Sequence, residues 1–513
     1  MTNSFALPRN LIIFAVLVPL ALLVGYLLAT PTDTVSFIGV GFVVIGVLLP
    51  LLLRWHHSMV IVGWNMAVTI FFLPGQPYLW MPLVVVSVAI SFLDWLLTKK
   101  PSFLYVPSLT WSLVALGLVT LVTAKITGGI GIRALGGDSY GGKQYLLILL
   151  AITGFFALVF KRLDPAKAKL LVALFFLSGV TPIVSSLAYY AGPGFYFVYW
   201  AFPATYAAMQ AQADWMVGSA YARLSAFAPA GQALMVFLLQ RYGIQGLLKG
   251  SKPWRSIVFL LILFATLLGG YRSNIIIAGV LITALFFIER LYRTRIIVGA
   301  VAILIVLGAF LFPNATRLPL AVQRSLSVLP IEVDPIASYD AQASTEWRLR
   351  MWRYLMPEVP KHLWRPKGFS LDPTELYLVT EANRRGLAED VDVAIASGSY
   401  HNGPISLLLG LGVWGAAAFT WVIVAGLVAL YRNYRFGAPE FSNINGLLLA
   451  FFIARLIYFL FVFGHFSEDL YVFTGILGLS ISLNGGVRRF EELQAPSAVQ
   501  PEPSLLLPEP VAQ

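Results

Sequence analysis

Long apolar runs separated by short polar breaks dominate the chain. A helix needs about 20 apolar residues to cross the hydrocarbon core of a bilayer. Lipid offers no partner for backbone N–H and C=O groups, so each spanning run must be helical. The pattern predicts an all-α polytopic membrane protein of about fourteen transmembrane helices, at residues 10–29, 34–53, 59–75, 78–97, 103–123, 145–161, 168–190, 227–242, 255–271, 273–290, 296–313, 402–431, 444–463 and 469–485.

The first run follows Arg9 and has no convincing small-residue cleavage site, so we expect it to stay as a span. Positive residues then fall on alternate connections, as cytoplasmic loops of membrane proteins do. This alternation predicts that both termini are cytoplasmic. The clusters are Arg54; Lys99 and Lys100; Lys161, Arg162, Lys167 and Lys169; Lys249, Lys252 and Arg255; Arg290, Arg293 and Arg295; Arg432 and Arg435; and Arg488 and Arg489.

The same pattern divides the chain into six regions. Its loops on the non-cytoplasmic side include an aromatic stretch, which is typical of a helix lying at the membrane interface, and one large hydrophilic domain. The proline-rich tail has the composition of a disordered segment. The regions are helices 1–7 at 1–190, the aromatic segment at 191–226, helices 8–11 at 227–313, the large periplasmic loop domain at 314–401, helices 12–14 at 402–485, and the cytoplasmic tail at 486–513.

Composition agrees with a membrane protein, since 58% of residues are hydrophobic and 12% are charged. The chain has no cysteine, which excludes disulfides, thiolate metal sites and thiol nucleophiles. Its five histidines are scattered, so no metal site is expected, and no Gly-rich phosphate loop suggests ATP hydrolysis. The net charge of +11 is spread over short loops and indicates membrane anchoring, not nucleic-acid binding. We expect no cofactor.

Several arginines fall on the non-cytoplasmic side, where positive residues are normally depleted. Arg223 precedes the eighth span, Arg272 lies in the short turn between the ninth and tenth, and Arg348 begins a basic stretch that includes Arg350 and Arg353. Guanidinium forks bind phosphate oxygens bidentately, so converging arginines could bind a pyrophosphate. The alternatives are snorkelling side chains, ion pairs with external acids, or a solvated amphipathic helix.

His401 stands at the external start of a late span, where Asn402 can cap the helix and Pro404 suits its first turn. The positive end of the helix dipole disfavours imidazolium there. A neutral imidazole at the membrane surface is a competent general base near pH 7. The alternative is a purely structural, capping histidine. Arg455 lies within a span and requires a partner inside the bundle.

These residues resemble motifs of the O-antigen ligase and O-antigen polymerase superfamily, a group of bacterial envelope glycosyltransferases. The resemblance covers residues 220–485 and departs from the family pattern at Ala226, Tyr271 and Gly410. The matching elements are Tyr400-His401-Asn402-Gly403-Pro404-Ile405 followed by Gly412 and Gly415; Arg348-x-x-x-Trp352; Lys367-Gly368-Phe369; Arg272-Ser273; and Arg223-Leu-Ser-Ala-Phe-Ala-Pro229.

The resemblance implies metal-independent, inverting transfer of a glycan from undecaprenyl pyrophosphate to an acceptor hydroxyl. The expected acceptor is a glycan or a lipid A core, at the periplasmic face of the bacterial inner membrane. Arg223, Arg272 and Arg348 would hold the pyrophosphate, and His401 would take the proton from the acceptor. Asn402, Trp352, Arg350 and Arg353 would support them, and the lipid tail would lie beside residues 195–206.

Two other classes of function stay open at this point. One is a lipid or polysaccharide flippase, which the number of spans also fits. The other is a non-catalytic protein of envelope polysaccharide assembly, because a fold does not fix a function. The concentration of charge in one external domain argues against the first, and the combination of His401 with the arginines argues against the second.

Overall fold

The computed structural model describes residues 18–23, 25–26, 29, 34–71, 73, 75–98, 103–130, 141–208, 211 and 223–488. Within these ranges the regular elements are all helices, and the only β-bridge pairs Thr69 with Tyr78. Nine helices of the described part are long and apolar enough to cross a membrane. The prediction of an all-α polytopic membrane protein is therefore confirmed. Most of the first predicted span and nearly all of the tail lie outside the described residues.

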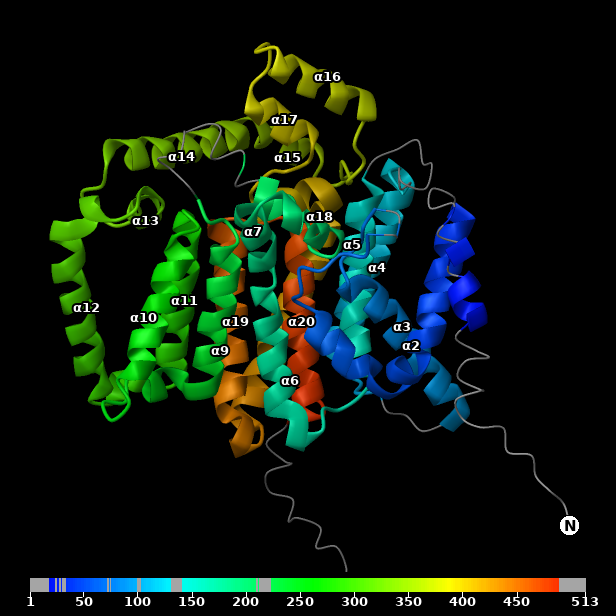
Figure 1. The fold of residues 1–513 in the computed structure, drawn as a ribbon, viewed down its shortest axis with the longest axis horizontal. Coiled ribbons are helices and arrows are strands. Elements are labelled where there is room, and N and C mark those ends of the chain that lie inside the picture. Colours follow the sequence, from blue (N-terminus) through cyan, green and yellow to red (C-terminus); the bar gives the residue numbers. More distant parts are fainter. Residues whose placement is uncertain are drawn as a thin grey trace, which may run out of the picture.

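The membrane helices stand side by side in one bundle (Figure 1). Most bounds lie within a few residues of the predicted spans, because a long apolar run fixes where a spanning helix must lie. The helices are α2 (Thr34–Gly63), α3 (Trp80–Thr98), α4 (Pro107–Thr127), α5 (Gly142–Val159), α6 (Pro165–Leu177), α7 (Pro182–Ala191), α9 (Phe227–Leu247), α10 (Trp254–Leu267), α11 (Arg272–Ile288), α12 (Ile296–Asn314), α18 (Gly403–Phe436), α19 (Ser442–Phe461) and α20 (Phe466–Asn484).

One predicted span is wrong. The sequence predicts helices at 34–53 and 59–75, but α2 runs without a break to Gly63, and the described residues between it and α3 (64–71, 73 and 75–79) are not helical. The free backbone groups of this segment are satisfied locally: Ile70 donates to the carbonyl of Pro77, and Leu79 to that of Val68, at 3.0 and 2.8 Å. Hydropathy cannot separate such a hairpin from a full span, because both are apolar.

The structure describes only part of the aromatic stretch that is predicted to lie at the interface. Its first part forms a 3-10 helix, η3 (Pro193–Trp200), which packs on α7 and exposes Phe197 and Trp200 by 64% and 65%. Exposed aromatic rings of this kind are typical of a membrane–water interface. Residues 209–210 and 212–222 lie outside the described part of the chain.

Helix α20 is the centre of the bundle and α12 is its edge. Of the apolar window of α20, 83% is buried, and it packs against α5, α18 and α19. The window of α12 is 0% buried, so this helix meets lipid along its length. Figure 1 shows α12 at the margin, connected to the rest by its two ends.

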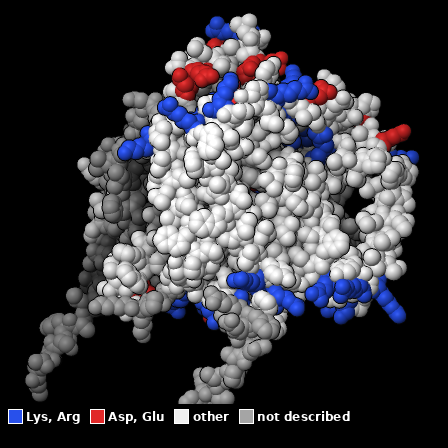
Figure 2. Space-filling view, turned by 180° about the vertical axis from the view of Figure 1, so that it is seen from behind, with Lys and Arg blue, Asp and Glu red and all other residues white. Residues whose placement is uncertain are grey.

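The predicted loop domain forms five short helices at one end of the bundle (Figure 1). They are α13 (Leu320–Leu326), α14 (Pro335–Leu355), α15 (Glu358–Lys361), α16 (Pro373–Arg384) and α17 (Asp390–Ala396). Figure 2 shows a wide band without charged side chains below this domain, and lysines and arginines gathered at the opposite end. A band of this kind is what a bilayer-spanning protein presents to lipid.

Candidate functional site

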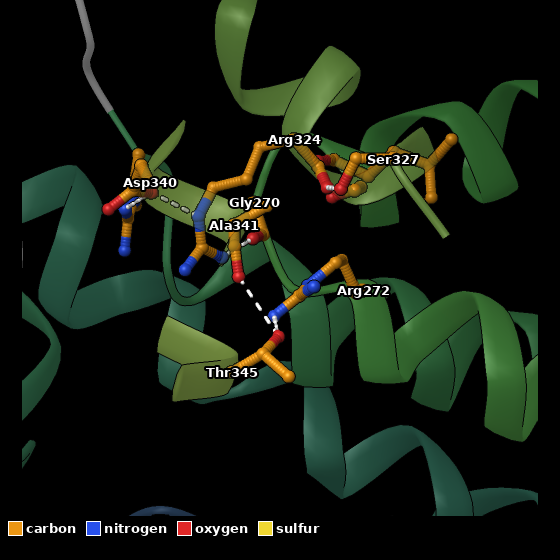
Figure 3. A network of polar contacts seen from close by, with 10 residues as sticks. Gly270, Arg272, Arg324, Ser327, Asp340, Ala341 and Thr345 are labelled. Carbon is orange, nitrogen blue, oxygen red and sulfur yellow. Dashed lines mark hydrogen bonds and ion pairs between the residues drawn. The ribbon is translucent and has the colours of Figure 1, made fainter. Parts of the chain in front are cut away.

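The arginine group lies where α13 and α14 of the loop domain cover the ends of α9, α10 and α11. Asp340 of α14 accepts hydrogen bonds from Arg223, which precedes α9, and from Arg324 of α13 (Figure 3). Arg324 also donates to the carbonyl of Gly270, in the turn between α10 and α11. One carboxylate therefore joins segments that are far apart in sequence.

Arg272 is the first residue of α11 and points toward the same helix, α14. Its Nη2 donates to Thr345 Oγ1 at 2.8 Å, and the hydroxyl of Thr345 donates to the carbonyl of Ala341 at 3.1 Å (Figure 3). A hydrogen bond to a neutral hydroxyl leaves the guanidinium charge uncompensated. Arg272 is thus held at the end of the bundle that the loop domain covers. Its guanidinium has N–H donors besides the one bonded to Thr345, and these could bind an anion.

Arg348 lies one turn further along α14. Its guanidinium carbon is 5.8 Å from the centre of the Phe463 ring, a cation–π distance. Burial lowers the pKa of Arg348, the nearby Tyr458 partly offsets this, and Arg324 lowers the pKa further. Arg324 and Arg348 are thus close enough to repel each other, and an arginine remains charged at neutral pH even so.

The predicted arginines therefore gather in one place. Four guanidiniums, those of Arg223, Arg272, Arg324 and Arg348, are grouped around α14, and Asp340 forms ion pairs with two of them, Arg223 and Arg324. Within this group positive charge exceeds negative charge. Such a surplus in a partly desolvated place stabilises a bound polyanion more than the same charges would in water.

His401 lies between aromatic rings next to Arg348. The imidazole is 5.2 Å from the Trp347 ring and 5.0 Å from the Phe463 ring, and Phe463 is the ring that Arg348 covers. Its Nε2 is 3.3 Å from Ser399 Oγ, while its buried Nδ1 has no hydrogen-bond partner among the described residues. A buried ring nitrogen without a protein partner is unusual in a folded protein and is consistent with a functional role of the imidazole.

Burial, followed by the charges of Arg348 and His465, lowers the pKa of His401 to about 4. The imidazole is therefore neutral near pH 7 and can accept a proton. His401 also has a φ of +49°, in the left-handed region that most residues avoid. Such strain is found at functional sites more often than elsewhere, and it must be compensated by the surrounding structure.

Trp352 and Asn402 supply that compensation. The indole of Trp352 donates to the carbonyl of Tyr400 at 3.1 Å, and Asn402 caps α18 by accepting from the backbone N–H of Ile405 at 3.0 Å. The backbone is thus tied on both sides of His401. Tyr400 and Ile405 are buried in the same small core as Met351.

The two other supporting arginines predicted from sequence lie elsewhere. Arg350 pairs with Glu389 of the loop domain at 2.9 Å, and both side chains are exposed. Arg353 is exposed near the end of α14. An exposed ion pair contributes at most about 1 kcal/mol, so Arg350 mainly ties α14 to the segment before α17.

Sequence reasoning missed Arg324, Asp340 and the partner of Arg455. Arg324 is 6% exposed although it lies in a hydrophilic domain, and only its apolar neighbours Leu320, Ala321 and Val322 hint at burial. The partner of Arg455 is Asp469, at 2.5 Å. The sequence does place Asp469 in the first turn of α20. That this acid pairs with Arg455 of α19 depends on how the two helices pack, which the sequence does not give.

Residues 257–420 match a family model described as O-Antigen ligase. The matched segment begins in α10 and ends within α18, so it contains Arg272, Arg324, Asp340, Arg348 and His401. Arg223 and all of α2 to α9 lie before it. None of the curated proteins matches the chain.

Proposed function

The chain belongs to the O-antigen ligase superfamily through residues 257–420, and from this premise we propose that it transfers a glycan from undecaprenyl pyrophosphate to an acceptor hydroxyl. The acceptor is a growing glycan or a lipid A core, and the reaction takes place at the periplasmic face of the inner membrane. The observation that carries the proposal is the position of His401 next to Arg348 of the arginine group, since both contact the ring of Phe463.

The proposed reaction uses these residues in two roles. The acceptor oxygen attacks the anomeric carbon from the face opposite the pyrophosphate, and the configuration at that carbon inverts. The bond from that carbon to the pyrophosphate oxygen breaks, and undecaprenyl pyrophosphate leaves with the electron pair. The hydroxyl proton passes to His401, and the arginines stabilise the negative charge that develops on the leaving group.

The electrostatics of the free site favour a sequence in which the donor binds first and His401 then takes the proton. Arg348 helps to keep His401 neutral before the donor binds. A bound pyrophosphate would offset the charge of Arg348, and the pKa of His401 would then rise toward its ordinary value. The donor would thereby make its neighbour a stronger base at the moment when the base is needed.

The lipid tail of the donor has a path that starts at the arginine group. An apolar groove of about 570 Å³ runs between α11 and α19, and its lining includes Ile275, Val280, Ile453 and Ile457. Ile275 lies one helical turn after Arg272 in α11. The lipid chain of a donor whose pyrophosphate is bound at Arg272 could therefore enter the groove directly. We place the tail here in preference to the predicted position beside residues 195–206.

The first test replaces His401 in the full-length protein. We expect His401→Gln and His401→Ala to fold and insert normally, and each to lower glycan transfer by roughly 10²-fold or more, the scale of general-base catalysis. Transfer is measured with purified protein and lipid-linked donor in vesicles. Binding of the donor should survive, because the arginines hold its pyrophosphate.

A structural cap predicts a different result. Glutamine would then be tolerated, and alanine would lose stability and activity together. Full transfer by a well-folded His401→Gln protein would exclude the base role. The flippase or the non-catalytic assembly protein would then be the better interpretation.

A further inference from the structure

A second cavity, of about 480 Å³, enters the bundle from the end that carries the loop domain. Its mouth includes Lys143 at the start of α5, Gln232 in the first turns of α9 and Glu468 in the first turn of α20. Trp64 and Phe176 lie deeper, and the volume is in the range of small-molecule pockets, about 300–1,000 Å³. Arg348 and His401 are not among the described residues that line it.

The cavity lies where two helices are broken. Helix α2 ends at Gly63, and the next residue, Trp64, packs against Gly475 near the middle of α20 and donates to the carbonyl of Tyr471 at 3.2 Å. Helix α2 therefore ends at about half the depth of α20, and the backbone continues from there without helical structure to Thr69, whose N–H donates to the carbonyl of Ala201 after η3 at 2.7 Å. Non-helical backbone at such a depth occurs only inside protein or beside a water-filled cavity.

The second break separates α6 from α7. A 3-10 turn, η2 (Ser178–Val180), and Thr181 interrupt the helix at the same level. The backbone N–H of Ala67 donates to Thr181 Oγ1 at 2.8 Å, so the two breaks are hydrogen-bonded to each other. Paired broken helices of this kind frame substrate sites in membrane transporters, because they bring polar backbone to the middle of a bundle.

The walls of the cavity are aromatic. The rings of Trp80 and Tyr471 stack at 5.6 Å with 15° between their planes, and Trp64 lies 5.4 Å from Trp80. Tyr78 and Tyr206 add two phenol groups. An aromatic face is electron-rich, so it attracts the C–H groups that line one face of a sugar ring.

Polar groups complete the lining. The amide nitrogen of Asn65 is bound to the carbonyl of Phe175 at 2.8 Å, which fixes the direction of the amide, and Gln232 contributes a second amide. Each amide both donates and accepts hydrogen bonds, as each sugar hydroxyl does. Trp64 and Trp80 are 1% and 3% exposed, so the rings available to a ligand are those of Tyr78 and Tyr206, which are partly exposed. Aromatic rings together with amides match a carbohydrate.

The charges of the lining argue against the other ligands of this reaction. Arg455 is neutralised by Asp469 at 2.5 Å, while Glu468 and Lys143 form no ion pair with any described residue. One free acid and one free base give no excess charge to bind pyrophosphate. A polyprenyl chain would bury the carboxylate and the amides without partners, which is costly.

From this lining we propose that the cavity binds a sugar ring of the glycan substrate, a proposal that rests on the proposed function. Its position suits that role. Arg455 lines the cavity and lies 5.3 Å from the Tyr458 ring, whose hydroxyl is near Arg348. Asp469 holds the backbone N–H of His465 at 2.8 Å, next to His401. The Arg455–Asp469 pair thus separates the cavity from the reacting end.

The test is direct binding of free saccharides to the full-length protein in nanodiscs. One probe is the reducing oligosaccharide that mild acid releases from the lipid-linked glycan of the host cells. The other is the delipidated acceptor saccharide from the same cells. Saturation-transfer NMR gives both affinities, and the probe that binds shows whether the sugar comes from the donor or from the acceptor.

We expect Glu468→Gln and Gln232→Ala each to weaken binding about five- to tenfold, the scale of one lost hydrogen bond. Matched controls are Glu440→Gln and Gln245→Ala, both exposed and at the opposite end of the bundle, and these should bind as the wild type does. His401→Gln should also bind normally, because His401 does not line the cavity.

Two results would overturn the proposal: no binding of either saccharide to the wild type, or wild-type affinity in both cavity variants. Neither result depends on transfer. If His401→Gln retains transfer while the cavity variants lose binding, the role of His401 fails and the sugar site stands. If His401→Gln loses transfer and the cavity variants bind normally, the sugar site alone fails.

Discussion

At the scale of single residues, the site is defined by several arginines that are grouped around one carboxylate, that of Asp340. Arg324 and Arg223 share one carboxylate, that of Asp340, and Arg272 donates to the neutral hydroxyl of Thr345. A buried ion pair alone is weak support for stability, since desolvation cancels much of the attraction. Under the proposed function, this cluster would be a preformed anion site that the pyrophosphate of the donor completes.

Arg272 provides the sharpest residue-level test of that site. We expect Arg272→Lys to reduce transfer nearly as much as Arg272→Ala, because an ammonium cannot form the bidentate fork that a guanidinium offers to phosphate oxygens. Apparent donor affinity in the transfer assay is the measurement. An Arg272→Lys protein with wild-type affinity would show that only the charge matters.

The pKa of His401 predicts an unusual pH profile. A general base must be deprotonated, and a pKa lowered to about 4 keeps His401 deprotonated well below the ordinary histidine value. We therefore expect kcat/KM, which reports the free enzyme, to stay level from about pH 8 to about pH 5.5. An imidazole with the ordinary pKa would lose half its activity near pH 6.5, about the value in model peptides.

The profile of kcat should differ, because it reports the complex with donor bound. A bound pyrophosphate would offset the charge of Arg348 and raise the pKa of His401, so we expect the acid limb of kcat to lie at higher pH than that of kcat/KM. Coincident limbs would contradict the coupling between Arg348 and His401.

At the scale of elements, a break in α18 allows the loop domain to form hydrogen bonds with that helix. Gly412 has a φ of +65°, and the break frees backbone groups on both sides of it. Val413 donates to the carbonyl of Leu363 at 2.7 Å, and the carbonyl of Leu409 accepts from Lys367 at 2.9 Å. The segment before Phe369 is thus hydrogen-bonded into the gap of the helix.

Gly412→Ala should therefore loosen the loop domain. A methyl group at Gly412 would lie 2.6 Å from the carbonyl oxygen of Leu363. The backbone there, with φ +65° and ψ −162°, is essentially restricted to glycine and costs another residue about 1–3 kcal/mol. We expect a lower unfolding temperature and faster tryptic cleavage near Lys361 and Lys367. Gly308→Ala is the matched control, because open space surrounds Gly308. Equal cleavage of the two variants would refute this.

The sequence predicts elements better than it predicts their partners. Apolar runs locate nearly every spanning helix, and the order Arg272, Arg348 and His401 indicates a site on one side. Gly410 departs from the pattern of the family, and only the packing explains this glycine, since a Cβ there would lie 2.4 Å from the Phe369 ring. Asp340 could not be predicted either, because one of its two partners, Arg223, lies 117 residues away in the sequence.

At the scale of the whole molecule, the two ends of the bundle differ in charge. Figure 2 shows acidic and basic side chains together at the loop-domain end, and almost only lysines and arginines at the other. The arginine group, His401 and the mouth of the aromatic cavity lie at the loop-domain end. Positive residues are enriched on the cytoplasmic side of membrane proteins. The loop domain is therefore expected to face the periplasm, where a lipid-linked donor and its acceptor would meet.

Cysteine labelling tests this orientation without background, because the chain contains no cysteine. Ser338 lies in the loop domain, Ser251 and Ser442 lie at the opposite end, and all three are exposed. We expect an impermeant maleimide to label Ser338→Cys in intact cells whose outer membrane has been opened. Ser251→Cys and Ser442→Cys should label only after the inner membrane is permeabilised. Labelling of Ser251→Cys in intact cells would reverse the orientation and place His401 and the arginines in the cytoplasm, away from any periplasmic acceptor.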